Sequence, residues 1–130
     1  MLPNDAHCHF FSSGFLERLT KVWTQPVCAA VQFDKVGLTS ATATPDNAIN
    51  VIQWVTSGWA ERGFDPAMPA ITEVRYQDVD GLWSIAETDI YINATDHEFT
   101  LADPDEGKLR LDAVLTHELG HVLGLLHTCE

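Results

Sequence analysis

The residue types and spacing best suited to chemistry lie in the stretch T-H-E-L-G-H-V-L-G-L-L-H, residues 116–127. His117 and His121 are four residues apart, so on an α-helix both imidazoles project from one face and can bind one metal ion. Glu118 would lie about 100° further round the helix, beside the metal, where it can take a proton from water that the metal polarises. The spacing therefore predicts a metal site with a general base next to it.

A glycine and a third histidine extend this pattern. Gly124 can end the helix by adopting a left-handed conformation at low cost. A turn there would carry His127 back toward the metal as a third ligand, whereas a helix continued to residue 127 would point it away from His121. A bare H-E-x-x-H recurs by chance in unrelated helices, but the added glycine and histidine favour a Zn²⁺ site.

The composition is that of an ordinary globular protein. The chain has 130 residues, 45% hydrophobic and 20% charged, and we expect a single domain over residues 1–130. Seven Lys and Arg against nineteen Asp and Glu give a formal net charge of −12. Nucleic acid is therefore an unexpected partner, because this charge repels phosphates. Short apolar runs predict no membrane span, no signal peptide is recognisable, and the oligomeric state stays open.

Other candidate ligands are less well arranged. Of the three cysteines, Cys8, Cys28 and Cys129, the first two are the candidate pair for one disulfide. Cys129 follows the third histidine by two residues and could lie near the metal, but a free or otherwise paired cysteine is favoured there. The run His7 to His9 alternates sides on an extended chain and is interpreted as a terminus rather than a metal cage.

Two acidic turns are candidates for Ca²⁺. They are Asp78 to Gly81, D-V-D-G, and Asp103 to Gly107, D-P-D-E-G. Carboxylates suit calcium, but the interpretation as plain acidic turns is favoured for both.

The elements that must position the site follow from hydrophobic periodicity. Helical spacing predicts helices from Ser12 to about Trp23 and from Leu109 through the histidine motif. The second has a core-facing stripe of Leu111, Leu115, Leu119 and Val122. Strands are expected at residues 27–33, 49–56, 71–77 and 86–93, the last being the final strand, with loops at 37–47 and 58–69. Residues 71–77, I-T-E-V-R-Y-Q, alternate apolar and polar side chains, and their charged face suits a sheet edge.

The motif H-E-L-G-H-V-L-G-L-L-H resembles the extended zinc motif of the metzincin metalloproteases, and within them the matrixin-like branch, in which H-E-L-G-H-x-L-G-L-x-H is usual. The likeness continues upstream. The segment A-E-T-D-I-Y-I-N, then Phe99 and Asp112 ahead of V-L-T-H-E, is similar to the strand before the active-site helix in secreted bacterial matrixin-type proteins. The resemblance covers about residues 70 to 127.

The resemblance implies an α+β (α/β-like) fold, the N-terminal subdomain of a zincin. Its parts would be a twisted, mostly parallel sheet with one antiparallel edge strand, a backing helix and an active-site helix. It further implies a secreted zinc endopeptidase acting on a protein or peptide that pairs with the edge strand at residues 71–77. Ile71, Glu73 and Arg75 are the substrate-binding candidates. The implied zinc ligands are His117, His121 and His127, with Glu118 as the base.

One feature departs from the family. Metzincins place a methionine-bearing turn after the third histidine, whereas the methionines here, Met1 and Met68, precede the helix. We therefore expect a matrixin-like domain that lacks the C-terminal Met-turn subdomain. The alternatives are a zinc-binding but proteolytically inactive domain and a different zinc amidohydrolase that shares H-E-x-x-H.

Overall fold

The computed structural model describes residues 15–25, 31–34, 37–104 and 107–127. The three cysteines, His7 to His9 and Ser12 lie outside these residues, and so do the predictions made for them. Residue contacts divide the chain into two units, residues 1–39 and 40–130, and each is described by itself. The single domain expected over the whole chain stays a prediction.

The first unit contains helix α2, Phe15–Thr24. This confirms the predicted helix over its described part, and Phe15 and Leu19, one helical turn apart, are buried. The strand predicted at residues 27–33 is wrong over residues 31–33, which have no regular structure. Strand propensity requires a partner strand, and among the described residues none pairs with this segment.

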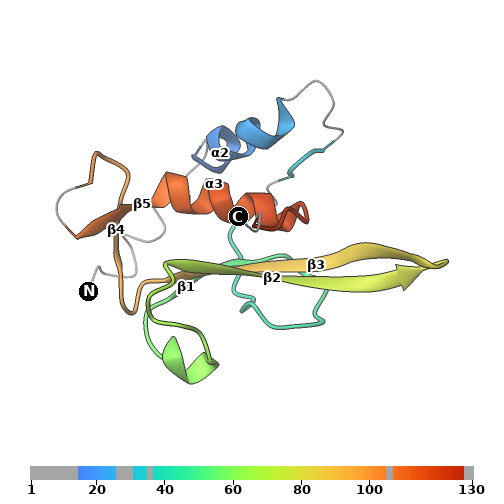
Figure 1. The fold of residues 1–130 in the computed structure, drawn as a ribbon, viewed down its shortest axis with the longest axis horizontal. Helices are drawn as coiled ribbons and strands as arrows, with labels where there is room; N and C mark the ends of the chain where they lie inside the picture. Colours follow the sequence, from blue (N-terminus) through green and yellow to red (C-terminus); the bar gives the residue numbers. More distant parts are fainter. Residues whose placement is uncertain (1–14, 26–30, 35–36, 105–106, 128–130) are drawn as a thin grey trace. The chain divides into compact units, whose positions relative to one another are not determined.

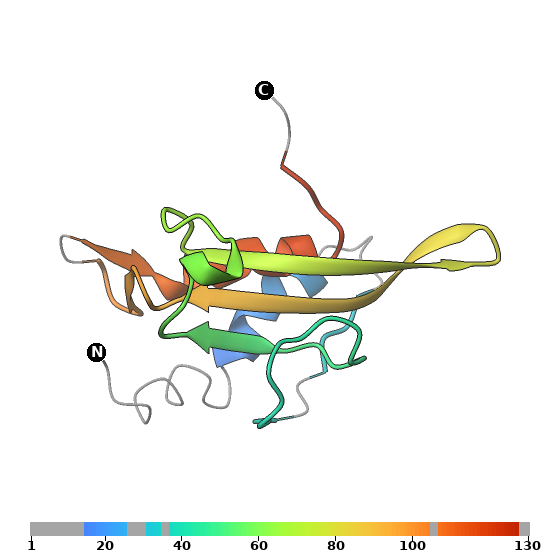
Figure 2. The ribbon, with the colours of Figure 1, turned by 90° about the horizontal axis from the view of Figure 1, so that it is seen from below.

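The second unit is built on a sheet of three strands, β1 (Ile52–Val55), β2 (Ala70–Val79) and β3 (Leu82–Asn93), in the order β1-β3-β2 (Figure 1). β1 pairs with β3 in parallel and β2 pairs with β3 antiparallel. The predicted antiparallel edge strand is thereby confirmed as β2. The expectation of a mostly parallel sheet is wrong, because this sheet is mixed and its antiparallel pairing is the longer one (Figure 2).

Strands β2 and β3 run further than predicted because the turn between them is shorter. Val79 pairs with Leu82, so that Asp80 and Gly81 alone form the turn, with φ of 54° and 82°. Two successive positive φ values match the right-handed twist of a hairpin, and Asp-Gly favours them. Asp78 Oδ1 accepts a hydrogen bond of 2.7 Å from the Gly81 amide and so fixes this turn.

Strand β1 is shorter than the predicted residues 49–56 because side chains bind the amides that precede it. The amide of Ala48 donates to Glu87 Oε2 at 2.6 Å, and the amide of Val51 donates to Asp89 Oδ1 at 2.9 Å. The loop predicted at residues 58–69 is confirmed and contains a short 3-10 helix, η1, Ala60–Arg62.

Two further strands precede the second helix. β4 (Glu98–Thr100) and β5 (Lys108–Arg110) pair in parallel as a separate two-stranded sheet. Residues 86–93 are therefore not the final strand, and Leu109 begins no helix because it lies in β5. Helix α3 is Leu111–Val122, and it contacts β2, β3 and β5.

Apolar side chains cover both faces of the main sheet. Because side chains alternate along β3, Tyr91 lies on one face and Ile90 and Ile92 on the other. On the Tyr91 face, a buried cluster is formed by Ala43, Val51, Val55, Trp59 and Tyr91. On the α3 face, the predicted stripe is buried at Leu111, Leu115 and Leu119 and half-buried at Val122. No helix among the described residues is long and apolar enough to cross a membrane.

Candidate metal centre

Helix α3 holds the first two histidines on one side. His117 and His121 are one turn apart, and their Nε2 atoms lie 3.1 Å from each other. His117 is exposed and His121 half-buried. The i, i+4 spacing therefore brings both imidazoles to one point, as the sequence predicted.

The end of α3 returns the chain toward these histidines. The Leu125 amide donates to the Gly120 carbonyl at 3.1 Å, and the Gly124 amide donates to the His121 carbonyl at 2.8 Å. This pair of bonds is a Schellman motif, and Gly124 occupies its left-handed position with φ of 82°. The predicted turn at Gly124 is confirmed, and His127 lies beyond it.

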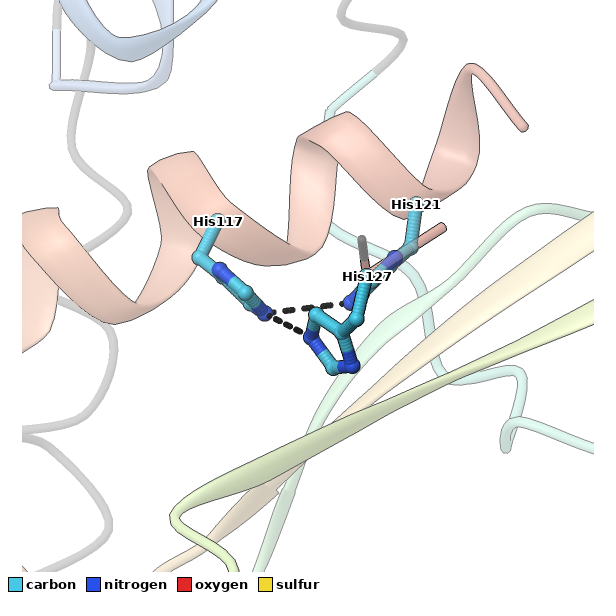
Figure 3. A group of neighbouring side chains, drawn as sticks. All are labelled: His117, His121 and His127. Carbon is cyan, nitrogen blue, oxygen red and sulfur yellow. Dashed lines mark hydrogen bonds between the residues drawn. The ribbon is translucent and has the colours of Figure 1, made fainter. Parts of the chain in front are cut away.

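The three histidines form one group of potential metal ligands, with their ligand atoms all within 4.8 Å of one another. His117 Nε2 lies 2.9 Å from His127 Nε2, and the three ring centroids are 4.7 to 5.0 Å apart. Two nitrogens on a tetrahedral zinc ion would be about 3.3 Å apart, given Zn–N distances of about 2.05 Å. Figure 3 shows the rings of α3 and of the segment after it converging. Three histidines can thus hold a metal ion here.

A hydrogen bond at Nδ1 of His121 leaves Nε2 of the same ring available to a metal ion. His121 Nδ1 lies 2.6 Å from the Leu125 carbonyl oxygen, which can only accept a hydrogen bond. Nδ1 therefore carries the proton, and Nε2, which faces the other histidines, keeps its lone pair in the neutral ring. Such a hydrogen bond on the far nitrogen is the usual way in which proteins orient a ligating histidine. The donor set suits zinc and other imidazole-binding transition metals.

Glu118, the predicted base, is buried, with 5% of its surface exposed. The hydroxyl of Thr72, on edge strand β2, lies 2.6 Å from Glu118 Oε2 and 3.3 Å from the Glu118 carbonyl oxygen. The shorter contact is the stronger hydrogen bond, and the hydroxyl donates it because an ionised carboxylate can only accept. Sequence reasoning missed Thr72, because a threonine in a strand is common and no pattern singles it out.

The structure does not bring the substrate-binding candidates to the histidines. Since Thr72 faces α3, strand alternation turns the side chains of Ile71, Glu73 and Arg75 to the opposite face. Glu73 Oε2 there accepts a hydrogen bond of 3.2 Å from the Tyr91 hydroxyl and lies 3.6 Å from the Arg75 guanidinium. Ile71 packs against the buried cluster. Any contact of Ile71, Glu73 and Arg75 with a substrate on the α3 side would therefore come from their main-chain groups.

Two groups on the opposite face, Tyr91 and Asp89, have a shifted pKa. Burial, followed by the charges of Glu73 and Asp89, raises the pKa of Tyr91 to about 12. Burial also raises the pKa of Asp89, although the hydrogen bond from the Val51 amide lowers it in part. At the start of α3, by contrast, the hydrogen bonds from the Arg110 guanidinium lower the pKa of Asp112.

The calcium candidates gather no comparable group. Within residues 15–25, 31–34, 37–104 and 107–127, the histidine group alone brings together three possible metal-ligating side chains. Asp78 is engaged in its own turn, and Asp105 and Glu106 lie outside the described residues. Calcium at either turn stays a prediction.

Comparisons with known proteins give no relative for the chain. No family model matches the sequence, and neither a curated protein nor a solved structure is significantly similar to it.

Proposed function

We propose that this chain is a matrixin-like zinc endopeptidase domain. The observation that carries the proposal is the convergence of three Nε2 atoms from a helix and the segment after its glycine turn, with Glu118 following the first ligand in sequence. This combination supports the resemblance of H-E-L-G-H-V-L-G-L-L-H to the metzincin motif.

The chemistry would divide between the metal and the chain. Zinc, when bound, supplies a Lewis acid that polarises a peptide carbonyl and makes water a better nucleophile near neutral pH. His117, His121 and His127 would hold it. Glu118 would accept the proton from the attacking water and pass it to the leaving amine, as a general base and then a general acid. Its burial would exclude bulk water from the carboxylate.

Edge strand β2 offers a place for an extended substrate. Among the described residues β2 pairs with β3 on one side, so the main-chain groups of its other edge are not used in this sheet. A peptide can add to such an edge as a further strand, with its affinity coming from main-chain hydrogen bonds. Because α3 packs on β2, that peptide would lie beside the histidine helix.

Two measurements on the full chain test the proposal. Zinc content by mass spectrometry should be one ion per chain, and cleavage of a labelled casein should depend on that zinc. Glu118→Ala should abolish cleavage and leave the zinc content unchanged, because Glu118 is a base and not a ligand. Glu61→Ala removes an exposed glutamate of η1 and is the matched control, which should cleave as the wild type does.

The outcomes separate the functions that the sequence left open. Cleavage that survives Glu118→Ala would show that the base is wrongly assigned. One bound zinc without cleavage would support the zinc-binding, proteolytically inactive domain. Zinc binding that does not need His127 would favour a different zinc amidohydrolase.

A further inference from the structure

The hydroxyl of Thr72 is the one donor that the described residues give to the Glu118 carboxylate, and it comes from a different element of the fold. Glu118 lies on α3, whereas Thr72 lies on β2, 46 positions earlier in the sequence. At 2.6 Å the contact has the length of a charge-assisted O–H···O bond, which is stronger than a bond between neutral groups. It therefore fixes the side chain of Glu118 as well as the packing of α3.

The geometry also distinguishes the two carboxylate oxygens. Thr72 has one hydroxyl proton, which the carboxylate accepts at Oε2. Oε1 receives no hydrogen bond from Thr72 and keeps its lone pairs for another partner. A carboxylate held by one oxygen can present the other in a defined direction, which is what a general base needs.

The strand that carries Thr72 is also the edge strand to which a peptide would add. The main-chain groups of β2 would set the position of the substrate, and the side chain of Thr72 sets the position of Glu118. The same strand, β2, would thus position both the substrate and Glu118. A small misplacement of the base relative to the substrate is costly, because proton transfer requires hydrogen-bond distance.

We propose that Thr72 is a positioning residue for the proposed peptidase, in which its hydroxyl orients Glu118 toward the attacking water. The inference rests on the proposed function. A purely structural Thr72, which merely fastens α3 to β2, would affect stability and substrate affinity without a specific effect on the chemical step. The two roles therefore differ in how kcat and KM respond.

The first experiment compares kcat and KM of the full-length chain with zinc added at one equivalent. Thr72→Val keeps the shape and the strand propensity but removes the donor, and we expect kcat about tenfold lower with KM within about twofold. Thr72→Ser restores the hydroxyl and should recover most of kcat. Thr95→Val is the control, because it removes a threonine hydrogen bond of 3.1 Å to the Val55 carbonyl, and it should leave kcat unchanged. If Thr72→Val does not fold, Thr72→Ala compared with Thr72→Ser gives the same test.

The second experiment measures the hydrogen bond without any turnover. Urea unfolding of the metal-free chain is followed for Thr72→Val, Glu118→Ala and the double variant. If the hydroxyl binds the carboxylate, the two effects on unfolding free energy are not additive. Additive effects would overturn the contact on which the inference depends.

The failures are distinguishable. An inactive wild type overturns the proposed function, and the catalytic role of Thr72 with it. An active wild type whose kcat is unchanged by Thr72→Val overturns the role of Thr72 alone. A kcat that rises in Thr72→Val would show that the hydroxyl competes with water for Glu118, which also contradicts the proposal.

Discussion

Buried carboxylates lie on both sides of the β1-β3-β2 sheet, and the two sides differ in the kind of donor from which these carboxylates accept hydrogen bonds. On the face that bears Tyr91, Glu87 and Asp89 accept hydrogen bonds from main-chain amides of the segment before β1. On the face that bears α3, Glu118 accepts its hydrogen bond from the side-chain hydroxyl of Thr72. All three carboxylates are buried, with 3% to 5% of their surface exposed.

This difference separates carboxylates that fix the course of the backbone from the carboxylate that we propose as the base. An amide bound to Glu87 or Asp89 belongs to the backbone, so these carboxylates determine where the chain enters β1. Glu118 ties together two elements already formed by their own hydrogen bonds, and it follows a histidine of the metal group. Burial alone therefore does not distinguish the proposed base from the other two carboxylates. Its donor and its neighbours do.

The largest expected effect is the loss of zinc affinity when one histidine of the group His117, His121 and His127 is removed. Histidines outside this group should not matter for zinc affinity. His121→Ala deletes a proposed ligand, so zinc affinity should fall by more than about a hundredfold, since the loss of a residue that only hydrogen-bonds to a ligating histidine already costs about ten- to a hundredfold. His97→Ala is the matched control. His97 contacts the Pro66 carbonyl at 2.9 Å and lies outside the group.

Zinc affinity would be measured by competition with a chromophoric chelator. Equal losses of zinc affinity in His97→Ala and His121→Ala would show that α3 does not provide the metal site. The proposed chemical role of the α3 face would then be contradicted.

The metal group could be predicted from sequence because its geometry is local. His117, His121 and the turn at Gly124 depend on helix periodicity and on the conformational freedom of one glycine, and both are encoded within a few residues. The edge strand was also predicted, from the alternation in residues 71–77, whereas the hairpin at Asp80-Gly81 was predicted only as a turn over residues 78–81.

The remaining features depend on contacts between distant residues. Strands β4 and β5 have three residues each and stabilise each other, so neither has a strand signal by itself. The start of β1 depends on the carboxylates of Glu87 and Asp89, almost forty residues away. The contact of Thr72 with Glu118 likewise requires the packing of α3 on β2, which no local pattern contains.

On the opposite face, Tyr91 should make stability fall in alkali. The pKa of Tyr91 is raised from 10.0 to about 12 in the folded chain, so its contribution is complete below pH 10 and is lost as pH rises toward 12. A rise in pKa from 10.0 to about 12 corresponds to about 2 to 3 kcal/mol of unfolding free energy. Tyr91→Phe should remove this loss, because phenylalanine does not ionise.

The measurement is urea unfolding of wild type and Tyr91→Phe between pH 8 and pH 11.5. Zinc affinity at pH 7.5 should be the same in both chains. If Tyr91→Phe loses stability in alkali just as the wild type does, the ionisation of Tyr91 is not the cause of that loss.

Gly124→Ala should couple backbone strain to metal binding. An alanine at φ of 82° costs about 1 kcal/mol, and its Cβ would lie 3.4 Å from Ile85 Cδ1. Because the turn carries His127, zinc affinity should also fall. Gly63→Ala imposes similar strain at φ of 85° with nothing within 4 Å, and it lies after η1.

Thermal unfolding and zinc titration of both glycine variants check this. We expect similar losses of stability and a loss of zinc affinity in Gly124→Ala alone. Equal zinc affinities would show that the turn does not position His127.

The smallest expected effect concerns the first turn of α3 and has the opposite pH dependence from Tyr91. Hydrogen bonds from Arg110 lower the pKa of Asp112 below 3.8, so their contribution is present above that pH and is lost as pH falls through the folded pKa. Both side chains are partly exposed, at 40% for Arg110 and 30% for Asp112, so solvent screens the pair and its contribution to stability is small. Asp112→Asn should therefore flatten the acid side of the stability profile between pH 5 and pH 2.5 and leave the alkaline side unchanged. Tyr91→Phe should do the reverse, and a single variant that altered both sides would show that the two faces do not titrate independently.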